Sequence, residues 1–285
     1  MRDLAYRLQL LAALLAACLM FGGAPTAAQQ TGSLDFTAHV SPTDGQAEPA
    51  RGMTVYLLRK SFTDICRESE ASEPVLQMDP FIEKLEVSAP MKAWMKEHRR
   101  VELSGTDFPK LISPQDIFDV PEFSDAFAKR SELDPSVKLP PAKYLSIDKK
   151  KHPDKYQAAL DQYHDALREY IKNHPEMLDT MYLALEPVDP GPRWTKMQHD
   201  RKEHIRRHAL ELAGLRYLAA KTETDLEGRG HFSGVAPGAY WLSTLESQAA
   251  AGDVRVRWDF AVRVTAGRVS AAELSNLNAV EPRAP

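Results

Sequence analysis

This chain of 285 residues has few cysteines and no excess of positive charge. Its two cysteines, Cys18 and Cys66, exclude a disulfide framework and a cysteine-based zinc site. Cys66 lies among apolar residues and is expected to pack as a small hydrophobe; pairing between chains and a reactive thiol are the alternatives. The formal net charge of −4 argues against a nucleic-acid binder, since such proteins are usually basic.

The common catalytic motifs are also missing. The sequence holds no Gly-x-Ser-x-Gly elbow, P-loop, dinucleotide fingerprint, Cys-x-x-Cys-His or His-Glu-x-x-His. Acid pairs such as Glu83 and Glu86 have the spacing of a helix surface. We therefore expect no enzyme, no catalytic residue, no cofactor and no resident metal.

No apolar run is long enough for a comfortable membrane span. The longest ends at Phe21, short of the about 20 residues that a span needs. It follows Arg2 and Arg7 and precedes helix-breaking and small residues, which is the pattern of a secretory signal peptide over residues 1–28. We expect export to the periplasm or the extracellular space, and no membrane span after the signal is removed.

Two alternatives to a cleaved leader remain open. One is a retained N-terminal anchor. The other is a lipoprotein, because Leu15-Ala16-Ala17-Cys18 resembles a lipobox that would make Cys18 the lipidated residue. The apolar run continues for three residues beyond Cys18, where a lipoprotein usually turns polar, so soluble export is the preferred prediction.

Glycine is rare in the middle of the chain, and proline is concentrated there. Of 20 prolines, 14 lie within 74–192, whereas only three of 14 glycines lie within 61–221. Glycine serves tight turns between strands, and proline starts helices. This predicts an α+β fold in which an antiparallel, seven-stranded-type β-sandwich (29–60 and 222–285) is interrupted by a large α-helical insertion (61–221).

Periodicity locates the main elements. Strict alternation of apolar residues predicts a strand over 33–40, and apolar runs predict strands over 53–58, 239–245, 254–264 and 269–274. Apolar stripes at steps of three and four residues predict long helices over 153–173 and 193–220. Pro237 and Gly238 fit the central positions of a type II turn, which needs positive φ at its second central residue.

The stretch from Thr224 to Leu242 carries a family resemblance. Its Thr/Asp-rich lead, Gly228, Phe232, the Gly234-Val-Ala-Pro-Gly238 turn and the following Tyr-Trp-Leu resemble the carboxypeptidase regulatory-like domain, also called transthyretin-like or prealbumin-like. Ala236 replaces the first proline of the family's turn, and Gly230 is extra. The resemblance implies an antiparallel β-sandwich that acts as a binding or accessory module in exported bacterial proteins. It implies no catalytic residues.

Two histidines and an arginine on one predicted helix are weak binding candidates. His204 and His208 share a helix face, as zinc-binding histidines do, but Ile205 stands where a metalloprotease has its general base. Neighbouring cations, Arg207 among them, would repel a dication. We expect a cationic, solvated helix face, with an anionic partner as the functional alternative.

The other binding candidates are Arg193, Trp194, Tyr240 and Trp241. Arg193 and Trp194 follow a rigid Asp-Pro-Gly-Pro loop and would be presented to a ligand, or Trp194 would anchor the helix. Alternation places Tyr240 on one face of its strand and Trp241 on the other. One of them fills the core, and the other stacks on a sugar or packs against the insertion.

Together these observations predict an exported, non-catalytic binding module whose helical insertion forms a partner surface. The expected partner is an envelope protein or a glycan. The alternative is a hydrolase or metal-dependent enzyme with a site between insertion and sandwich, using histidines such as His204, His208 or His231.

Overall fold

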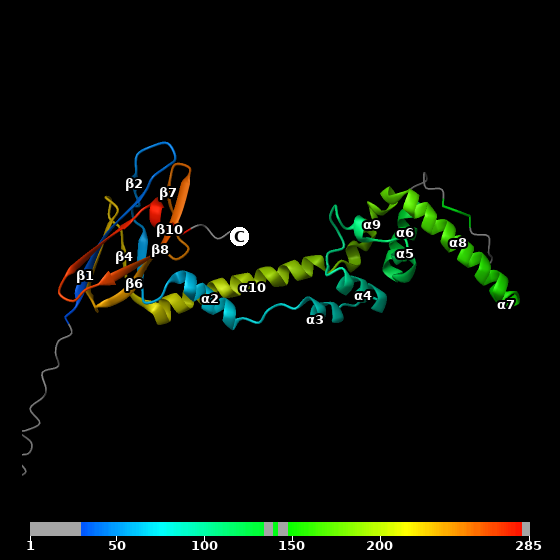
Figure 1. Ribbon diagram of the computed structural model, residues 1–285, viewed down its shortest axis with the longest axis horizontal. Helices are drawn as coiled ribbons and strands as arrows, with labels where there is room; N and C mark the ends of the chain where they lie inside the picture. The colour runs from blue at the N-terminus through cyan, green and yellow to red at the C-terminus, as the bar shows by residue number, and fades with distance from the viewer. Residues whose placement is uncertain (1–29, 134–138, 142–147, 281–285) are drawn as a thin grey trace, which may run out of the picture. The chain divides into compact units, whose positions relative to one another are not determined.

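Strands occur near both ends of the chain, and helices fill the sequence between β3 and β4 (Figure 1). The computed structural model describes residues 30–133, 139–141 and 148–280, so the predicted leader and Cys18 lie outside the described residues. The predicted α+β class, a β-sandwich interrupted by helices, is confirmed.

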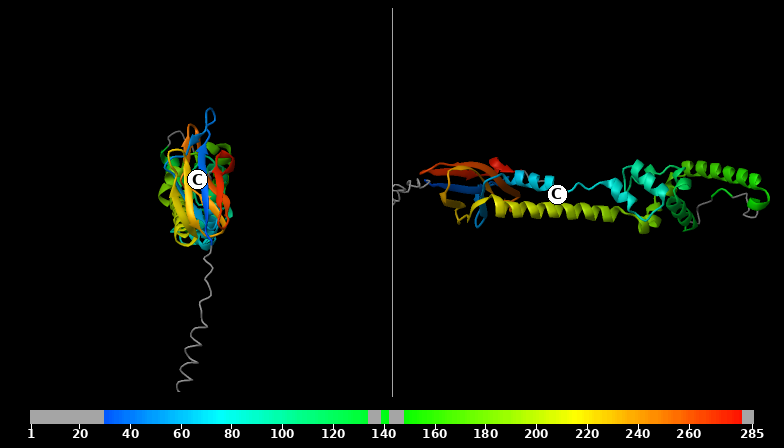
Figure 2. Two further views of the ribbon diagram at one scale, coloured as in Figure 1. Left: turned by 90° about the vertical axis from the view of Figure 1, so that its left-hand side faces the viewer. Right: turned by 90° about the horizontal axis from the view of Figure 1, so that it is seen from below.

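The first sheet is built around β1 (Gly32–Val40). β1 pairs antiparallel with β2 (Glu48–Pro49) and β5 (Arg229–Val235), and parallel with β9 (Val269–Leu274). In the left view of Figure 2, β1 in blue runs between its neighbours. Strands from opposite ends of the sequence therefore form one surface.

The second sheet is antiparallel. Its order is β10 (Ala279–Val280), β8 (Val254–Val264), β6 (Gly238–Ser243), β3 (Thr54–Leu58) and β4 (Leu218–Glu223), and β7 (Ala249–Ala251) also pairs with β8. Side chains of both sheets interdigitate in one core, in which Leu34, Leu57 and Trp258 are fully buried. The indole Nε1 of Trp258 donates to the carbonyl of Ser275 at 2.9 Å, so its burial leaves no polar atom unpaired.

The outer face of the second sheet carries a smaller core. Leu58 on β3 packs with Phe62 and Ile65 of α2 (Phe62–Ser72), with Ala209 near the end of α10 (Gly191–Leu212) and with Ala213 just after it. The chain divides into two compact units, 73–204 and the remainder on both sides. We call them the helical unit and the strand unit; α2 and the end of α10 belong to the strand unit.

The helical unit contains several short helices, the longer α6 and α8, and the first part of α10. Their bounds are α3 (Met78–Glu83), α4 (Ala89–Glu97), α5 (Asp116–Asp119), α6 (Pro121–Leu133), α7 (Asp148–Lys151), α8 (Pro153–Asn173) and α9 (Met181–Leu185), with 3-10 turns Pro109–Leu111, Pro175–Leu178 and Glu186–Val188. Its core centres on aromatic rings: Trp94 and Phe123 meet edge to face at 4.9 Å, beside Phe108.

The predicted helix over 193–220 is too long. The α-helix ends at Leu212, a π-helical turn spans Ala213–Tyr217, and Leu218–Glu223 form β4. The alanines of this segment favour a helix locally, but its pairing with β3, from Thr54↔Glu223 to Leu58↔Leu218, outweighs that preference.

The predicted role of Gly238 is also wrong. Gly238 already belongs to β6, where it pairs with Val264, and the positive φ falls on Gly234 at 66°. The hydroxyl of Tyr240 donates to the carbonyl of Ala236 at 2.8 Å and so fixes the connection between β5 and β6.

Candidate binding groove

The outward face of the first sheet carries charged and hydroxyl side chains. Along β1, Leu34, Phe36, Ala38 and Val40 point into the core, so Asp35, Thr37 and His39 point outward. In register, Asp35 lies between His231 of β5 and Ala271 of β9, and Thr37 lies between Arg229 and Glu273. Two outward rows therefore cross three strands.

A groove of about 830 Å³ lies over these rows. Its volume is within the range of small-ligand sites. Its floor includes the small residues Thr37, Gly230, Ala271 and Ala272. Its charged lining residues are Asp35, Glu223, Asp225, Arg229, His231 and Glu273. All of them belong to the strand unit.

Cross-strand pairs organise the floor. His231 Nδ1 lies 2.5 Å from Asp35 Oδ1, and His39 Nε2 lies 3.3 Å from Glu273 Oε1. The side chains of His231 and Asp35 are 56% and 58% exposed, so this pair contributes little to stability and stays accessible to a ligand.

The turn between β4 and β5 forms one wall. Asp225 Oδ1 accepts the backbone N–H groups of Glu227 at 3.0 Å and Arg229 at 2.7 Å. Gly228 has φ of 75°, and a Cβ there would lie 2.4 Å from the Ala38 carbonyl oxygen. Glycine is therefore required where the turn meets β1, and this close approach fixes the position of Arg229.

Carboxylates outnumber basic side chains in the groove lining. Carboxylates lie on β1, on β9 and on the wall beyond β5, whereas Arg229 is the one guanidinium among the lining residues. The only lining aromatic, Phe36, is 2% exposed because its ring is in the core. The groove thus offers ionic and hydrogen-bonding partners and almost no aromatic surface.

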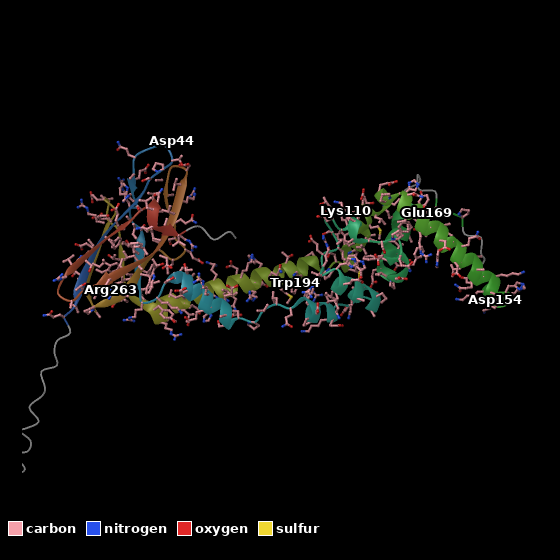
Figure 3. The ribbon with its side chains drawn as sticks, viewed as in Figure 1. Asp44, Lys110, Asp154, Glu169, Trp194 and Arg263 are labelled. Carbon is pink, nitrogen blue, oxygen red and sulfur yellow. The ribbon has the colours of Figure 1, made fainter. Side chains whose placement is uncertain are left out.

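Arg193 and Trp194 are part of the helical unit. The Trp194 ring lies 5.0 Å from that of Phe81, and the Arg193 guanidinium lies 5.9 Å from the same ring. Trp194, which Figure 3 labels, also packs against the aromatic core of this unit. These contacts are those of an anchor for α10.

The candidates further along α10 have separate partners. His204 Nδ1 lies 3.0 Å from Glu73 Oε1, and His208 Nδ1 lies 3.5 Å from Ser72 Oγ. Arg207 is exposed. The partner of each histidine is a residue in or just after α2, which gives both a role in holding that segment to α10.

Tyr240 and Trp241 point to opposite faces of β6, as the alternation predicts. Tyr240 is buried in the sandwich core, and Trp241 packs against the smaller core that includes Phe62 and Ile65. Both aromatics therefore have packing roles, and neither lines the groove. Of the histidines that the sequence singled out, His231 alone is in the groove lining.

In residues 30–133, 139–141 and 148–280, no three His, Cys, Asp or Glu side chains gather as ligands for a metal ion. Over the same residues, no helix combines the length and the apolar character that crossing a bilayer requires.

Comparisons with protein-family models, with curated proteins and with solved structures gave no match to this chain. The resemblance to the carboxypeptidase regulatory-like domain accordingly stays a prediction.

The sequence pattern did not predict most of the groove residues as binding residues. Alternation over 33–40 identifies Asp35 and Thr37 as outward-facing, but outward residues are usually only solvated. Asp35 and His231 are separated by 196 positions, and Glu273 is more distant still. Only the strand order brings them together, and no local pattern encodes it.

Proposed function

We propose that this protein is an exported, non-catalytic binding module whose ligand lies in the groove across β5, β1 and β9. The observation that carries the proposal is the groove itself. Its floor is made of small side chains, and ionisable side chains surround that floor on a β-sheet. Sites on strands hold their side chains more firmly than sites on loops. The sandwich is then the binding element, and the insertion is a separate partner surface.

The chemistry of the lining favours binding over catalysis. The hydroxyls in the lining come from Thr37 and Thr222. One carboxylate oxygen of Asp225 already accepts hydrogen bonds from backbone amides. A nucleophile held by a base, with donors for an oxyanion nearby, is the usual arrangement of a hydrolase. The groove instead spreads its charges over a broad surface, as recognition requires.

The test is amide chemical-shift mapping on the ¹⁵N-labelled mature chain. The probes are a neutral oligosaccharide, an anionic peptide and a cationic peptide. We expect at least one probe to shift groove amides. Ala271→Trp, which fills the floor, should abolish those shifts. Val269→Trp is the matched control, since it places the same ring two residues earlier on the same exposed face of β9. Shifts that survive Ala271→Trp, or no shifts with any probe, would contradict the proposal.

Hydrolysis is the second candidate function, and the His231–Asp35 pair is the observation that favours it. A carboxylate on Nδ1 orients an imidazole so that Nε2 can act as a general base. A panel of ester, phosphoester and glycoside substrates distinguishes the two functions. Turnover that is lost in His231→Gln would support hydrolysis, whereas turnover equal to that of buffer supports a binding module.

A further inference from the structure

We infer that the groove takes a lysine- or arginine-rich, extended segment of a partner protein. This inference rests on the proposed function and names the chemistry of its ligand. It starts from charge complementarity: four carboxylates, those of Asp35, Glu223, Asp225 and Glu273, line the groove, against the guanidinium of Arg229 and the imidazole of His231. Carboxylates outnumber the basic groups of the lining, so the groove favours a cationic partner over an anionic one.

The spread of the carboxylates favours an extended chain over a compact cation. Neighbouring strands are about 4.8 Å apart, so positions on β5 and β9 that flank β1 are about 10 Å apart. Asp35 lies on the central strand, Glu273 on β9 and Glu223 at the end of β4. Alternate side chains of an extended peptide point the same way at about 7 Å spacing. Two lysines at alternate positions would therefore reach carboxylates on different strands.

The floor and the exposure of the lining also fit a peptide. Thr37, Gly230 and Ala271 leave room for a backbone to approach the sheet. Glu223 is exposed, and Glu273 is exposed beside its partner His39, so both carboxylates are within reach of a ligand from solvent. A glycan site would normally offer an aromatic platform, but the ring of Phe36 is buried in the core. The groove therefore suits ammonium and guanidinium groups better than sugars.

Arg229 allows the direction of the electrostatic effect to be tested within the same groove. It lies opposite Thr37 in the row that ends at Glu273, so it opposes any bound cation. Removing carboxylates should weaken the binding of a cationic segment, and removing Arg229 should strengthen it. A merely structural effect of substitution would weaken binding in both cases.

The experiment is calorimetric titration of the mature chain with a capped hexapeptide that alternates threonine and lysine. Glu223→Gln/Glu273→Gln should weaken affinity about three- to tenfold, and Arg229→Gln should strengthen it about two- to threefold. Binding should fall as salt rises. Matched peptides with glutamine or glutamate in place of lysine should bind at least tenfold more weakly.

Each other outcome has a defined meaning. Equal affinity for the glutamine peptide, or weaker binding by Arg229→Gln, overturns the inference. Spermidine binding as tightly as the peptide shows a small-cation site and overturns it too. If a neutral oligosaccharide alone shifts the groove amides in the earlier experiment, the inference fails and the proposed function stands. If no probe binds there, both fail.

Discussion

At the scale of single residues, Gly230 shows how a position without a side chain supports the groove. A Cβ at Gly230 would lie 2.1 Å from Cζ of Phe36, whose ring is stacked on Phe232 at 5.7 Å. Residues beneath the groove floor are thus packed to their limit. In the sequence, Gly230 stands out only as an addition to the family's pattern, because the ring that it contacts is almost 200 positions away.

We expect Gly230→Ala to destabilise the strand unit by about 1–3 kcal/mol, because the Phe36 ring must leave its position. Urea unfolding followed by tryptophan fluorescence measures this change. Gly214→Ala is the control: a Cβ there has no neighbour within 4 Å, so we expect no loss. Equal loss in both variants would refute the packing argument.

At the scale of elements, the start of α2 is held by a residue of β8. Asp259 accepts the backbone N–H of Phe62 at 2.9 Å and of Thr63 at 3.0 Å, and its Oδ2 also accepts the Ser61 hydroxyl at 2.8 Å. An aspartate almost 200 positions away therefore caps this helix, in addition to the local cap that Ser61 makes to the Asp64 amide.

Asp259→Ala should lower the free energy of unfolding of the strand unit by about 1–2 kcal/mol, because two helix amides lose their acceptor. Hydrogen exchange should report faster exchange at Phe62 and Thr63 first. Arg255→Ala, an exposed change on the same strand, should stay within about 0.5 kcal/mol. Unchanged protection of these two amides would show that Ser61 alone caps the helix.

A second tie between elements involves Glu68 of α2. Hydrogen bonds from the Lys60 ammonium and then from the Tyr217 hydroxyl hold the pKa of the Glu68 carboxyl below its ordinary value of 4.5. The hydrogen bond to Glu68 raises the pKa of Lys60 above its ordinary 10.5. Arg216 also bonds Glu68 at 2.9 Å. The segment just after β3, helix α2 and the π-helical turn thus meet at one carboxylate.

The sign of the pH dependence follows from these directions. A lowered carboxyl pKa stabilises the fold above the ordinary value of 4.5, and this contribution is lost as pH falls through the lowered pKa. We expect Glu68→Gln to reduce the melting temperature at pH 7 and the difference from wild type to shrink as pH falls below the ordinary value of 4.5. Thermal unfolding across this range measures it. Glu70→Gln, exposed on the same helix, should show no such convergence.

Local sequence patterns predicted elements well where local and tertiary preferences agree. The alternation in 33–40 and the stripe in 153–173 both mark real elements, β1 and α8. They failed for β4, where helix-favouring alanines form a strand because β3 pairs with them. The turn predicted at Gly238 was wrong for a similar reason, since pairing with Val264 sets the backbone conformation of Gly238. Contacts far apart in sequence decided both outcomes.

At the scale of the whole molecule, the groove depends on strand order, which composition cannot reveal. The glycine and proline distribution predicted strands at the ends and helices between them. It did not predict that β1 would lie between β5 and β9, with a parallel partner from the end of the chain. The charges of the groove therefore became a site only when three distant segments were brought side by side.

The two compact units have separate cores, and this predicts separate responses to core substitutions. Phe123 is fully buried in the helical unit, and Leu57 is fully buried in the strand unit. Phe123→Ala should cost about 3–5 kcal/mol, and Leu57→Ala about 2–5 kcal/mol, through lost burial and residual cavities. Hydrogen exchange read by mass spectrometry should show each loss of protection within its own unit. Leu183→Ala, on an exposed side chain of the helical unit, is the control and should change little.

If Phe123→Ala lowers the protection of β1 and β5 as much as that of α6, the units unfold as one, and the groove's stability depends on the helical unit. If protection of these strands is unchanged, the groove is stabilised by the sandwich alone, and ligand binding should survive Phe123→Ala with unaltered affinity.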